Sequence, residues 1–332
     1  MKNLLLIIAL LFTILTANAD ANVEKYTTWL GVKLYFTSNG LRYTIKDNNK
    51  PSIRKTFTAN YPLALGMQVT VANFSLGYTF GGTQQWFNSA QKLKNSSKYW
   101  GLELNYMTNK LVFENQINSF GQFSVNSNCN CTQLVSASKS INSNYIDPLL
   151  KSFELSSNVQ YIFNGNKWSY KALQNNGAKQ VKSAGSFIAM MEYNYRQIRS
   201  TTDYIINQTP TKTDFDKYNL TKKMQASSPS LSVGYGYTLA YKSFYVGGIA
   251  YAGSGWLINR VKILSTSTSN DNFSFNGRLK ANAGFNGKRF YFGFSSNFAT
   301  INNNIKNELR SNWLNYEYNF YIGMRIATRK LF

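Results

Sequence analysis

The chain has 332 residues, of which 36 are lysine or arginine and 14 are aspartate or glutamate, and it contains no histidine, so its formal net charge is +22 at pH 7. Histidine is the most common general base of enzymes and a usual ligand of zinc, so its absence argues against an enzyme and against a zinc site. We expect no cofactor. The positive charge favours phosphate-bearing partners such as lipopolysaccharide, or an anion-selective interior. The alternative is the amino-acid bias of an AT-rich genome, and both explanations stay open.

The first 19 residues have the pattern of a secretory signal peptide. Lys2 supplies the positive start, residues 4–15 are apolar, and Ala17-Asn18-Ala19 is a small-residue cleavage site. Later apolar runs fall short of the roughly 20 residues that a spanning helix needs. We therefore predict a signal peptide at residues 1–19 and a single domain at residues 20–332. That domain could cross a membrane only as a closed β-barrel.

Apolar and polar residues alternate through the rest of the chain, with turn residues between the repeats. In the last repeat every second residue from Leu314 to Ile326 is large and apolar. This run exceeds the roughly 5 to 6 residues of a strand in a soluble protein and fits a membrane-crossing strand, which needs about 9 to 11. The candidate strands are 30–36, 41–45, 63–71, 74–80, 99–107, 110–123, 152–163, 167–173, 187–195, 231–239, 244–258, 273–285, 290–298 and 314–326.

These candidates predict an all-β fold, a transmembrane antiparallel β-barrel of about 14 strands. The sequence Ser38-Asn39-Gly40 is typical of a tight hairpin turn between the first two. Tight turns should all lie on the periplasmic side, yet here they follow odd-numbered strands in the first half and even-numbered strands in the second. A misassigned strand near residues 164–200 would remove the conflict, so 12 strands is the alternative.

The apolar register places charged residues on the inner face of the strands, because a charge facing lipid costs roughly 2 to 4 kcal/mol at the midplane. Such charges could line a channel in which basic residues set an anion preference. They could instead form an ion-pair network that fills the interior, although 12 to 14 strands enclose more space than side chains readily fill. The connection at 124–150 is the first candidate for an inward-folded constriction. The candidate interior charges are Lys33, Arg42, Glu103, Glu114, Glu154, Glu192, Arg196, Arg278, Lys280, Arg289, Glu317 and Arg325.

The C-terminal segment resembles a barrel-assembly signal, which commonly ends in an aromatic residue. We expect the barrel-assembly machinery to recognise it, although Thr328 and Lys330 interrupt the alternation before the last residue. The candidate signal residues are Phe320, Ile322, Met324, Ile326 and Phe332.

Two other motifs offer weak chemistry. Cys129-Asn130-Cys131 would form a strained disulfide, and it is a poor metal site without a nearby histidine. Asp214-Phe215-Asp216 with Asn219 lacks the glycine and the terminal glutamate of a calcium-binding loop. We therefore expect two loop thiols and a solvated acidic turn, with no metal site.

Several stretches resemble a family of uncharacterised Gram-negative outer-membrane proteins, a domain-of-unknown-function family. The resemblance covers roughly residues 26–298, and its most specific part is Ser183-Ala184-Gly185-Ser186-Phe187. It implies an exported outer-membrane β-barrel and brings no activity, substrate or catalytic residue. The Cys129–Cys131 loop and the tail depart from the family pattern. The other similar stretches are Lys167-Trp168-Ser169-Tyr170-Lys171-Ala172, Leu34-Tyr35-Phe36, Tyr61-Pro62, Tyr235-Gly236-Tyr237-Thr238 and Phe244-Tyr245-Val246-Gly247-Gly248.

The functional hypothesis from sequence is an outer-membrane channel or transporter for small solutes, anionic solutes among them. The alternative is an occluded structural or binding barrel whose basic loops, such as 199–226, engage lipopolysaccharide or a partner protein. Outer-membrane lipid, lipopolysaccharide, the barrel-assembly machinery and small solutes are the expected partners. We expect neither a nucleic-acid partner nor enzymatic activity.

Overall fold

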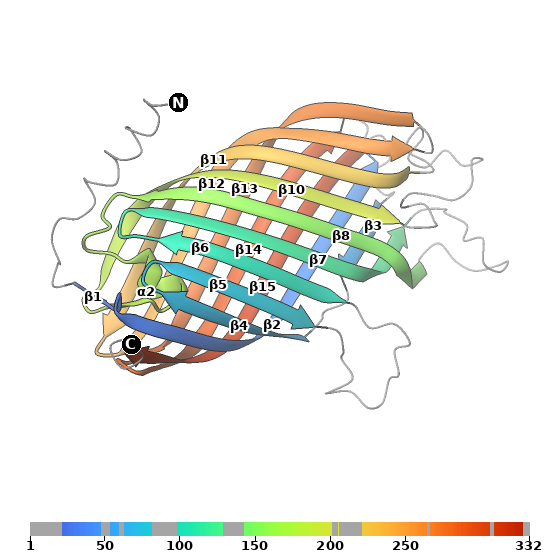
Figure 1. The fold of residues 1–332 in the computed structure, drawn as a ribbon. Coiled ribbons are helices and arrows are strands. Elements are labelled where there is room, and N and C mark those ends of the chain that lie inside the picture. The colour runs from blue at the N-terminus through green and yellow to red at the C-terminus, as the bar shows by residue number, and fades with distance from the viewer. Residues whose placement is uncertain are drawn as a thin grey trace, which may run out of the picture.

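The computed structural model describes residues 22–47, 54–59, 63–81, 98–128, 143–200, 205, 221–263, 266–305 and 309–327. Its strands form a tilted, closed wall (Figure 1). Among the described residues, no helix has the length and apolar character needed to cross a membrane. The elements are β1 (Val23–Lys25), β2 (Trp29–Asp47), β3 (Arg54–Ala59), β4 (Leu63–Val71), β5 (Phe74–Gly81), β6 (Tyr99–Met107), β7 (Leu111–Asn128), β8 (Ser143–Ile162), α2 (Tyr170–Gln174), β9 (Ala178–Gln180), β10 (Ala184–Ser200), β11 (Thr221–Tyr241), β12 (Phe244–Ile263), β13 (Thr266–Asn286), β14 (Phe290–Ile305) and β15 (Leu309–Ala327).

The wall is a closed antiparallel barrel of 12 strands, with two extra strands. From β4 to β8 and from β10 to β15 each strand pairs with the next in the chain, and β8 pairs with β10. β15 pairs with β2 from Leu309↔Asp47 to Ala327↔Trp29 to close the ring. β3 and β4 lie end to end along β2 and together make one crossing. β1 and β9 pair with each other outside this sheet.

The ring does not have the same number of strands at every level. β5 and β6 are short, and the last rung of β6 with β7 is Tyr99↔Phe120. Beyond that level β3 pairs directly with β7, from Ala59↔Phe123 to Arg54↔Asn128. The part of the barrel built without β5 and β6, here called the neck, therefore has two strands fewer.

The predicted fold class is confirmed, with the strand count at 12 and not 14. Ser38-Asn39-Gly40 is not a turn, because β2 runs through it. The Tyr316 ring of β15 covers Gly40, so this glycine makes room for a neighbouring side chain and does not bend the chain. Residues 167–173 are not a strand but enter α2.

These two corrections remove the conflict over the turns. The short connections at 72–73, 108–110, 242–243 and 287–289 now lie at the same end of the barrel as the paired residues Trp29 and Ala327. The opposite end carries short connections at 264–265 and 306–308, and also the long ones at 82–98, 129–142 and 201–220. In outer-membrane barrels the periplasmic turns are short and the longer loops are extracellular. The end with the short turns at 72–73, 108–110, 242–243 and 287–289 is therefore assigned to the periplasm, and the neck to the extracellular side.

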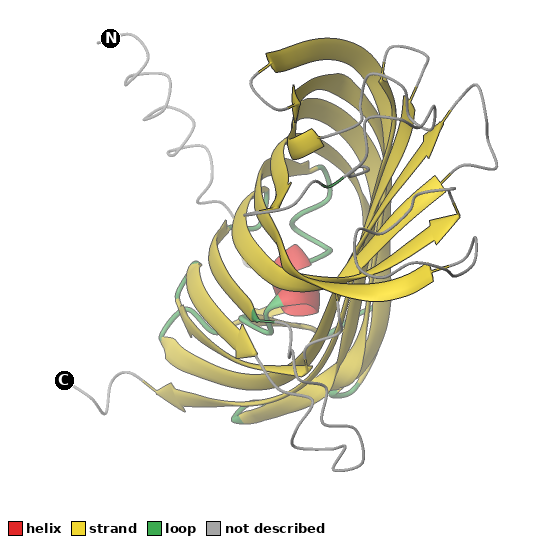
Figure 2. Ribbon diagram, turned by 90° about the vertical axis from the view of Figure 1, so that its right-hand side faces the viewer, coloured by secondary structure: helices red, strands yellow, loops and turns green. Residues whose placement is uncertain are grey.

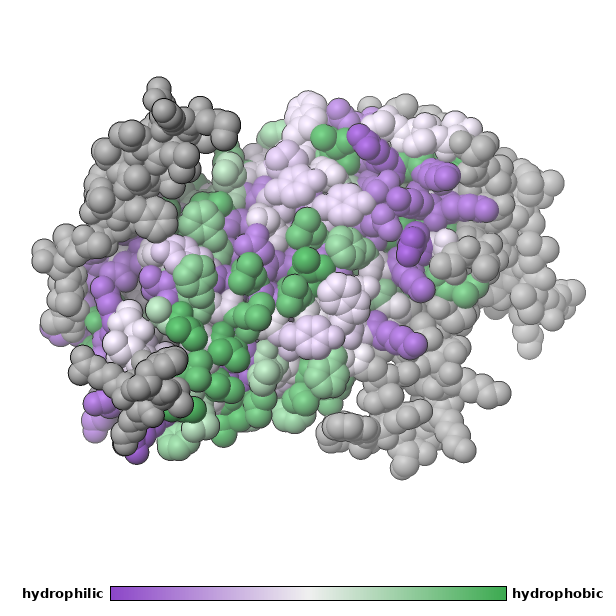
Figure 3. All heavy atoms as spheres, in the orientation of Figure 1, coloured by the Kyte–Doolittle hydropathy of each residue, from purple (hydrophilic) through white to green (hydrophobic). Residues whose placement is uncertain are grey.

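Large apolar side chains cover the outside of the wall (Figure 3). Val233 is 70% exposed, and Phe187 and Leu231 are each 68% exposed. Burial of such side chains in a soluble core would stabilise folding by about 1.5 to 3 kcal/mol each, so their exposure on one continuous face identifies that face as the lipid-facing one.

Candidate functional site

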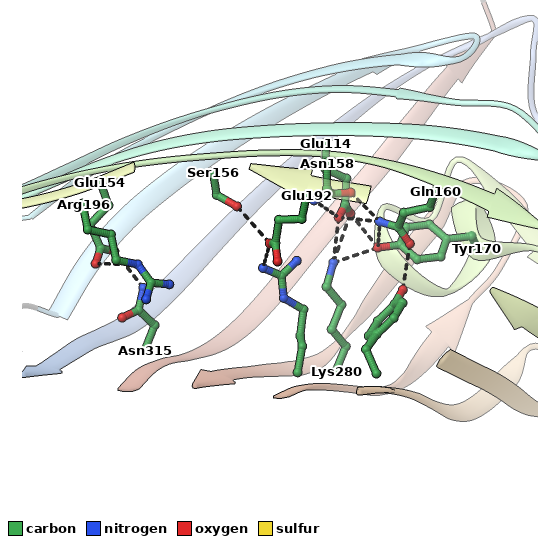
Figure 4. Close-up of polar contacts among 12 residues, drawn as sticks. Glu114, Glu154, Ser156, Asn158, Gln160, Tyr170, Glu192, Arg196, Lys280 and Asn315 are labelled. Carbon is green, nitrogen blue, oxygen red and sulfur yellow. Dashed lines mark hydrogen bonds and ion pairs between the residues drawn. The ribbon is translucent and has the colours of Figure 1, made fainter. Parts of the chain in front are cut away.

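Ion pairs cross the interior of the barrel. Lys280 of β13 donates to Glu114 of β7, with Nζ 2.9 Å from Oε2, and Arg278 of β13 donates to Glu192 of β10. Four other strands separate β13 from β7 on the shorter way round the wall. Figure 4 shows Glu114 and Lys280 reaching toward each other from opposite sides of the interior.

A second polar bridge lies nearer the neck. Glu154 of β8 faces Arg196 of β10, with Oε1 3.6 Å from Nε, and accepts a hydrogen bond of 2.7 Å from the Asn315 side chain of β15. The Arg196 guanidinium lies over the Trp313 ring, 5.7 Å from its centroid. Glu154 and Arg196 are directly opposed on neighbouring strands. β15 lies far round the wall from both β8 and β10, so the contacts of Asn315 and Trp313 with this pair join opposite walls.

A third group of contacts includes α2. The Tyr170 hydroxyl donates to Glu114 Oε1 at 2.7 Å and accepts from Lys280 Nζ at 2.7 Å. Gln160 of β8 donates to Glu114 at 3.0 Å and accepts at 2.7 Å from the Tyr251 hydroxyl of β12. Tyr170, Gln160 and Tyr251 are all buried.

These ion pairs indicate that the charged residues of the network stabilise the barrel. A charge taken out of water is costly, and its partner must offset that cost; removing one partner of a buried pair costs about 3 to 5 kcal/mol. Glu114, Glu154 and Glu192 each have a basic partner across or along the wall. The pair of Lys280 and Glu114 therefore holds opposite walls together, and the paired charges do not stand ready for a passing ion.

Next to this network lies a polar cavity of about 120 Å³. Lys33, Glu103 and Glu317 are among its lining residues. The Lys33 ammonium lies 5.5 Å from the centre of the Tyr35 ring and 5.3 Å from that of Tyr321. A cavity needs about 10 to 15 Å³ to hold one water molecule, so this one has room for a small group of waters.

The neck is filled by apolar side chains. Tyr43 of β2 and Met224 of β11 meet across it, with the hydroxyl donating to sulfur at 3.5 Å. Tyr43 also packs against Trp313, with ring centroids 4.1 Å apart. The buried cluster comprises Leu41, Tyr43, Ile45, Phe57, Ala59, Ala64, Tyr99, Phe120, Phe123, Val125, Leu150, Ile198, Ile205, Met224, Val261 and Trp313.

The periplasmic end is closed by an inward-folded segment at residues 163–183, here called the plug. Figure 2 shows its helix α2 inside the ring of strands. The Ser169 side chain caps α2 by accepting from the Ala172 amide at 3.1 Å. Trp168 is fully buried, and its indole N–H donates to Thr238 of β11 at 2.9 Å. The plug therefore packs into the lumen as part of the core.

Contacts from three directions hold the plug. β1 pairs with β9, from Val23↔Gln180 to Lys25↔Ala178. Arg325 of β15 donates to the carbonyl of Asn176 in the plug and, at 2.5 Å, to the Asn286 side chain at the β13 end. Its guanidinium lies over the Tyr26 ring, 4.0 Å from the centroid. Arg325 thus joins the plug, the residues before β2 and the wall.

Lys171 ties α2 to the turn between β4 and β5. Its Nζ donates to the Ala72 carbonyl and, at 3.3 Å, to the Asn73 side chain. Burial and the nearby positive charge of Lys25 lower the pKa of Lys171 to about 8. The charged form of this lysine is therefore less stable in the closed plug than in water.

Ten of the candidate interior charges point into the barrel: Lys33, Glu103, Glu114, Glu154, Glu192, Arg196, Arg278, Lys280, Glu317 and Arg325. Of the candidate assembly residues, Phe320, Ile322 and Met324 lie on the exposed outer face, Ile326 is half-buried, and Phe332 lies outside the described residues. Recognition by the assembly machinery stays a prediction.

Two candidate interior charges were assigned to the wrong place. Arg42 is exposed on the outer face, because β2 continues without a turn and brings Leu41 and Tyr43 inward. Arg289 is exposed in the turn before β14. Of the predicted constriction at 124–150, residues 124–128 and 143–150 belong to β7 and β8 of the wall, and residues 129–142 lie outside the described residues. The Cys129–Cys131 and Asp214–Asn219 motifs lie outside the described residues.

Sequence reasoning missed the plug residues Trp168, Tyr170 and Lys171. Trp168 and Tyr170 alternate with polar neighbours as strand residues do. The available signal was Ser169, a favoured cap residue, together with the turn-forming sequence Asn175-Asn176-Gly177 that follows. Because α2 has only five residues, helical periodicity had too little length to appear.

A family model described as a domain of unknown function, DUF4421, matches residues 19–325. The chain belongs to this family. The resemblance predicted from sequence is thus confirmed. A search of curated proteins finds no match.

Solved structures similar to this chain are outer-membrane β-barrels. The outer-membrane protease OmpT from Escherichia coli has a TM-score of 0.42 and 6% identity, with 94% of this chain and 99% of that chain covered. The β-domain of the Bordetella autotransporter BrkA has a TM-score of 0.36 and 13% identity, with coverages of 89% and 98%. The Pseudomonas putida toluene transporter TodX has a TM-score of 0.26 and 8% identity, with coverages of 93% and 91%.

The prediction that the chain is not an enzyme is wrong, because the sequence does not exclude enzymatic activity. A protease is among the barrels similar to it, and the barrel fold is shared by enzymes and by proteins that are not enzymes. Identities this low show the fold alone, so no activity of these neighbours passes to this chain. Localisation in the outer membrane agrees with the fold, whereas export by a signal peptide stays a prediction.

Proposed function

We propose that the protein is an occluded outer-membrane barrel that acts by binding at its surface and is not an open pore. The observation that carries the proposal is that side chains occupy the lumen at three successive levels. Tyr43 meets Met224 in the neck, Lys280 meets Glu114 at mid-height, and the plug fills the periplasmic end. An ion would have to break all three sets of contacts to cross.

The test is planar-bilayer conductance of the protein purified from outer membranes in detergent. We expect no conductance steps from protein that shows the heat-modifiable gel mobility of a folded barrel. Stable steps from such protein would contradict the proposal. The same recordings in a salt gradient would then give the ion preference of the pore.

The second candidate is a gated channel for small solutes, in which the plug is the gate. The observation that favours it is the polar cavity directly behind the plug, lined by Lys33, Arg278 and Lys280 together with Gln174 and Asn175 of the plug. Replacing residues 168–178 by a short Gly-Ser linker separates the two candidates. A gated channel would conduct after this replacement, whereas an occluded barrel would stay silent because the neck and the ion pairs remain.

A further inference from the structure

Basic side chains on four neighbouring strands form a row at the extracellular end of the barrel. Lys151 of β8 lies opposite Arg199 of β10, Arg199 lies opposite Lys223 of β11, and Lys223 lies opposite Lys262 of β12. Directly opposed residues have Cβ atoms about 4.5 to 5.5 Å apart. These four residues, here called the cation row, therefore stand side by side on adjacent strands.

The cation row faces outward. The residues next to its members in sequence, Leu150, Ile198, Met224 and Val261, are all buried in the apolar cluster of the neck. Because side chains alternate between the two faces of a strand, the row lies on the outer face, where three of its members are exposed and Lys223 is half-buried. Hydrophilic side chains gather over this end of the wall in Figure 3.

Among the described residues, the arrangement is electrostatically unfavourable without a ligand. Like charges directly opposite each other on neighbouring strands destabilise a sheet. The row is flanked by Gly121 of β7 and Ser267 of β13, which bring no negative charge. Asp271 of β13 also faces outward, but it is diagonal to Arg260 and below the row. A ligand with more than one negative charge would remove the repulsion.

The height of the row fits the surface of the outer leaflet. Phe187 marks the lower edge of the apolar face on β10. At about 3.3 Å per residue and a tilt of about 40°, Arg199 lies roughly 30 Å above Phe187 along the membrane normal. The apolar band of such barrels is about 25 Å tall. The cation row therefore stands just above the hydrocarbon, with Tyr193 of β10 and Trp256 of β12 exposed on the wall below.

We propose that the cation row binds the phosphate groups of a phosphorylated glycolipid of the outer leaflet, lipid A of lipopolysaccharide, while the apolar wall below it contacts the acyl chains. Lysine and arginine ammonium and guanidinium groups recognise phosphate by charge-assisted hydrogen bonds. This site rests on the proposed function as a surface-binding barrel and gives it a ligand class and four residues. Two of its residues, Arg199 and Lys223, lie in the segment 199–226, for which the sequence predicts contact with lipopolysaccharide or a partner protein.

The test compares two matched double variants of the protein purified in detergent and stripped of lipid. Lys151→Gln with Arg199→Gln removes two charges from the row. Lys288→Gln with Arg289→Gln removes the same two residue types from an exposed turn at the periplasmic end. The probe is fluorescent bisphosphorylated lipid A, with dephosphorylated lipid A and inorganic phosphate as separate arms.

We expect the row variant to raise the Kd for lipid A at least tenfold and the turn variant to change it less than twofold. Dephosphorylated lipid A should bind at least tenfold more weakly, and 0.5 M salt should weaken binding to the unchanged protein. Equal binding by the two variants, or equal binding of dephosphorylated lipid, would overturn the proposal. Displacement of lipid A by millimolar inorganic phosphate would also overturn it, because the ligand would then be free phosphate.

Two controls keep the outcomes distinct. Heat-modifiable mobility of each variant reports folding, and all four substituted side chains are exposed, so we expect folded barrels. If the variants were unfolded, charge-reducing single substitutions at Lys262 would replace them in the same assay. Conductance of the same preparation tests the occluded barrel separately, because conductance steps would refute the closed lumen. If the protein does not conduct and the row variant binds lipid A as tightly as the unchanged protein, only the proposal of the cation row is refuted.

Discussion

Lys280 and Glu114 meet across the lumen with Nζ 2.9 Å from Oε2, and the Tyr170 hydroxyl of the plug contacts both. We predict that Glu114→Gln or Lys280→Met alone destabilises the barrel by about 3 to 5 kcal/mol, because each leaves a buried charge without its partner. The measurement is the urea midpoint of unfolding in detergent micelles, followed by tryptophan fluorescence.

The double variant Glu114→Gln with Lys280→Met serves as its control. Replacing both partners of a buried pair often changes stability little, so the double variant should be more stable than at least one single variant. If the two single effects simply added, Lys280 and Glu114 would not act as a pair.

Trp168→Ala is expected to loosen the plug without unfolding the wall. The substitution removes a fully buried indole and its hydrogen bond to Thr238, a change that costs about 3 to 5 kcal/mol in a packed core. Hydrogen exchange of residues 163–183 should become faster, while strands β13 to β15 keep their protection. Equal loss of protection in the wall and the plug would show that the plug is part of the global folding unit.

The closed plug should become more stable as pH rises from 8 to 10.5. Burial lowers the pKa of Lys171 to about 8 from the ordinary value of 10.5, so in this window an opened plug holds a proton that the closed plug has lost. Below pH 8 both forms are protonated, and the cost of the buried charge is fully present, on the order of 3 kcal/mol.

The measurement is the protection factor of the α2 amides between pH 6 and pH 10, with Lys171→Met as the control. Burial raises the pKa of Tyr26, next to the plug, to about 12, so Tyr26 stays neutral over this range. The unchanged protein should gain protection as pH rises, and Lys171→Met should not. A parallel rise in both proteins would assign the effect to another group.

Arg325→Lys should detach the N-terminal residues from the barrel end. Arginine here donates in several directions, to Asn176, Gly287 and Asn286, and it stacks on Tyr26. Lysine has one ammonium and no planar group to stack, so it cannot keep all of these contacts. Limited proteolysis should cut near residues 22–28 at least fivefold faster, and an unchanged cleavage rate would show that β1 pairing alone holds this segment.

The lipid-facing side of the wall could be predicted from the sequence, but the residues that fill the interior of the barrel could not. Outward faces such as Leu231 to Leu239 stand out because lipid demands an apolar side chain at every second position. Alternation alone did not tell inside from outside at Leu41, Tyr43 and Ile45, since the neck interior is as apolar as the lipid face. Asn39-Gly40 matches a hairpin turn, and only the Tyr316 ring on another strand explains the glycine.

The partners of the interior charges were also out of reach. The sequence assigned Glu114 and Lys280 to inner faces, but which charge meets which depends on how strands distant in the chain face each other across the lumen. The preference for a channel assumed an interior too wide for side chains to fill. Long residues from both walls, together with the plug, span that width.

The β5–β6 hairpin widens the barrel where the polar cavity behind the plug lies. Its strands add circumference only at the level of the membrane, and Glu103 and Asn105 of β6 line the polar cavity there. Above the hairpin, β3 and β7 join directly, the perimeter shrinks, and apolar side chains close the space. The inserted hairpin thus leaves room for a polar cavity, whereas the narrower neck is filled by apolar side chains.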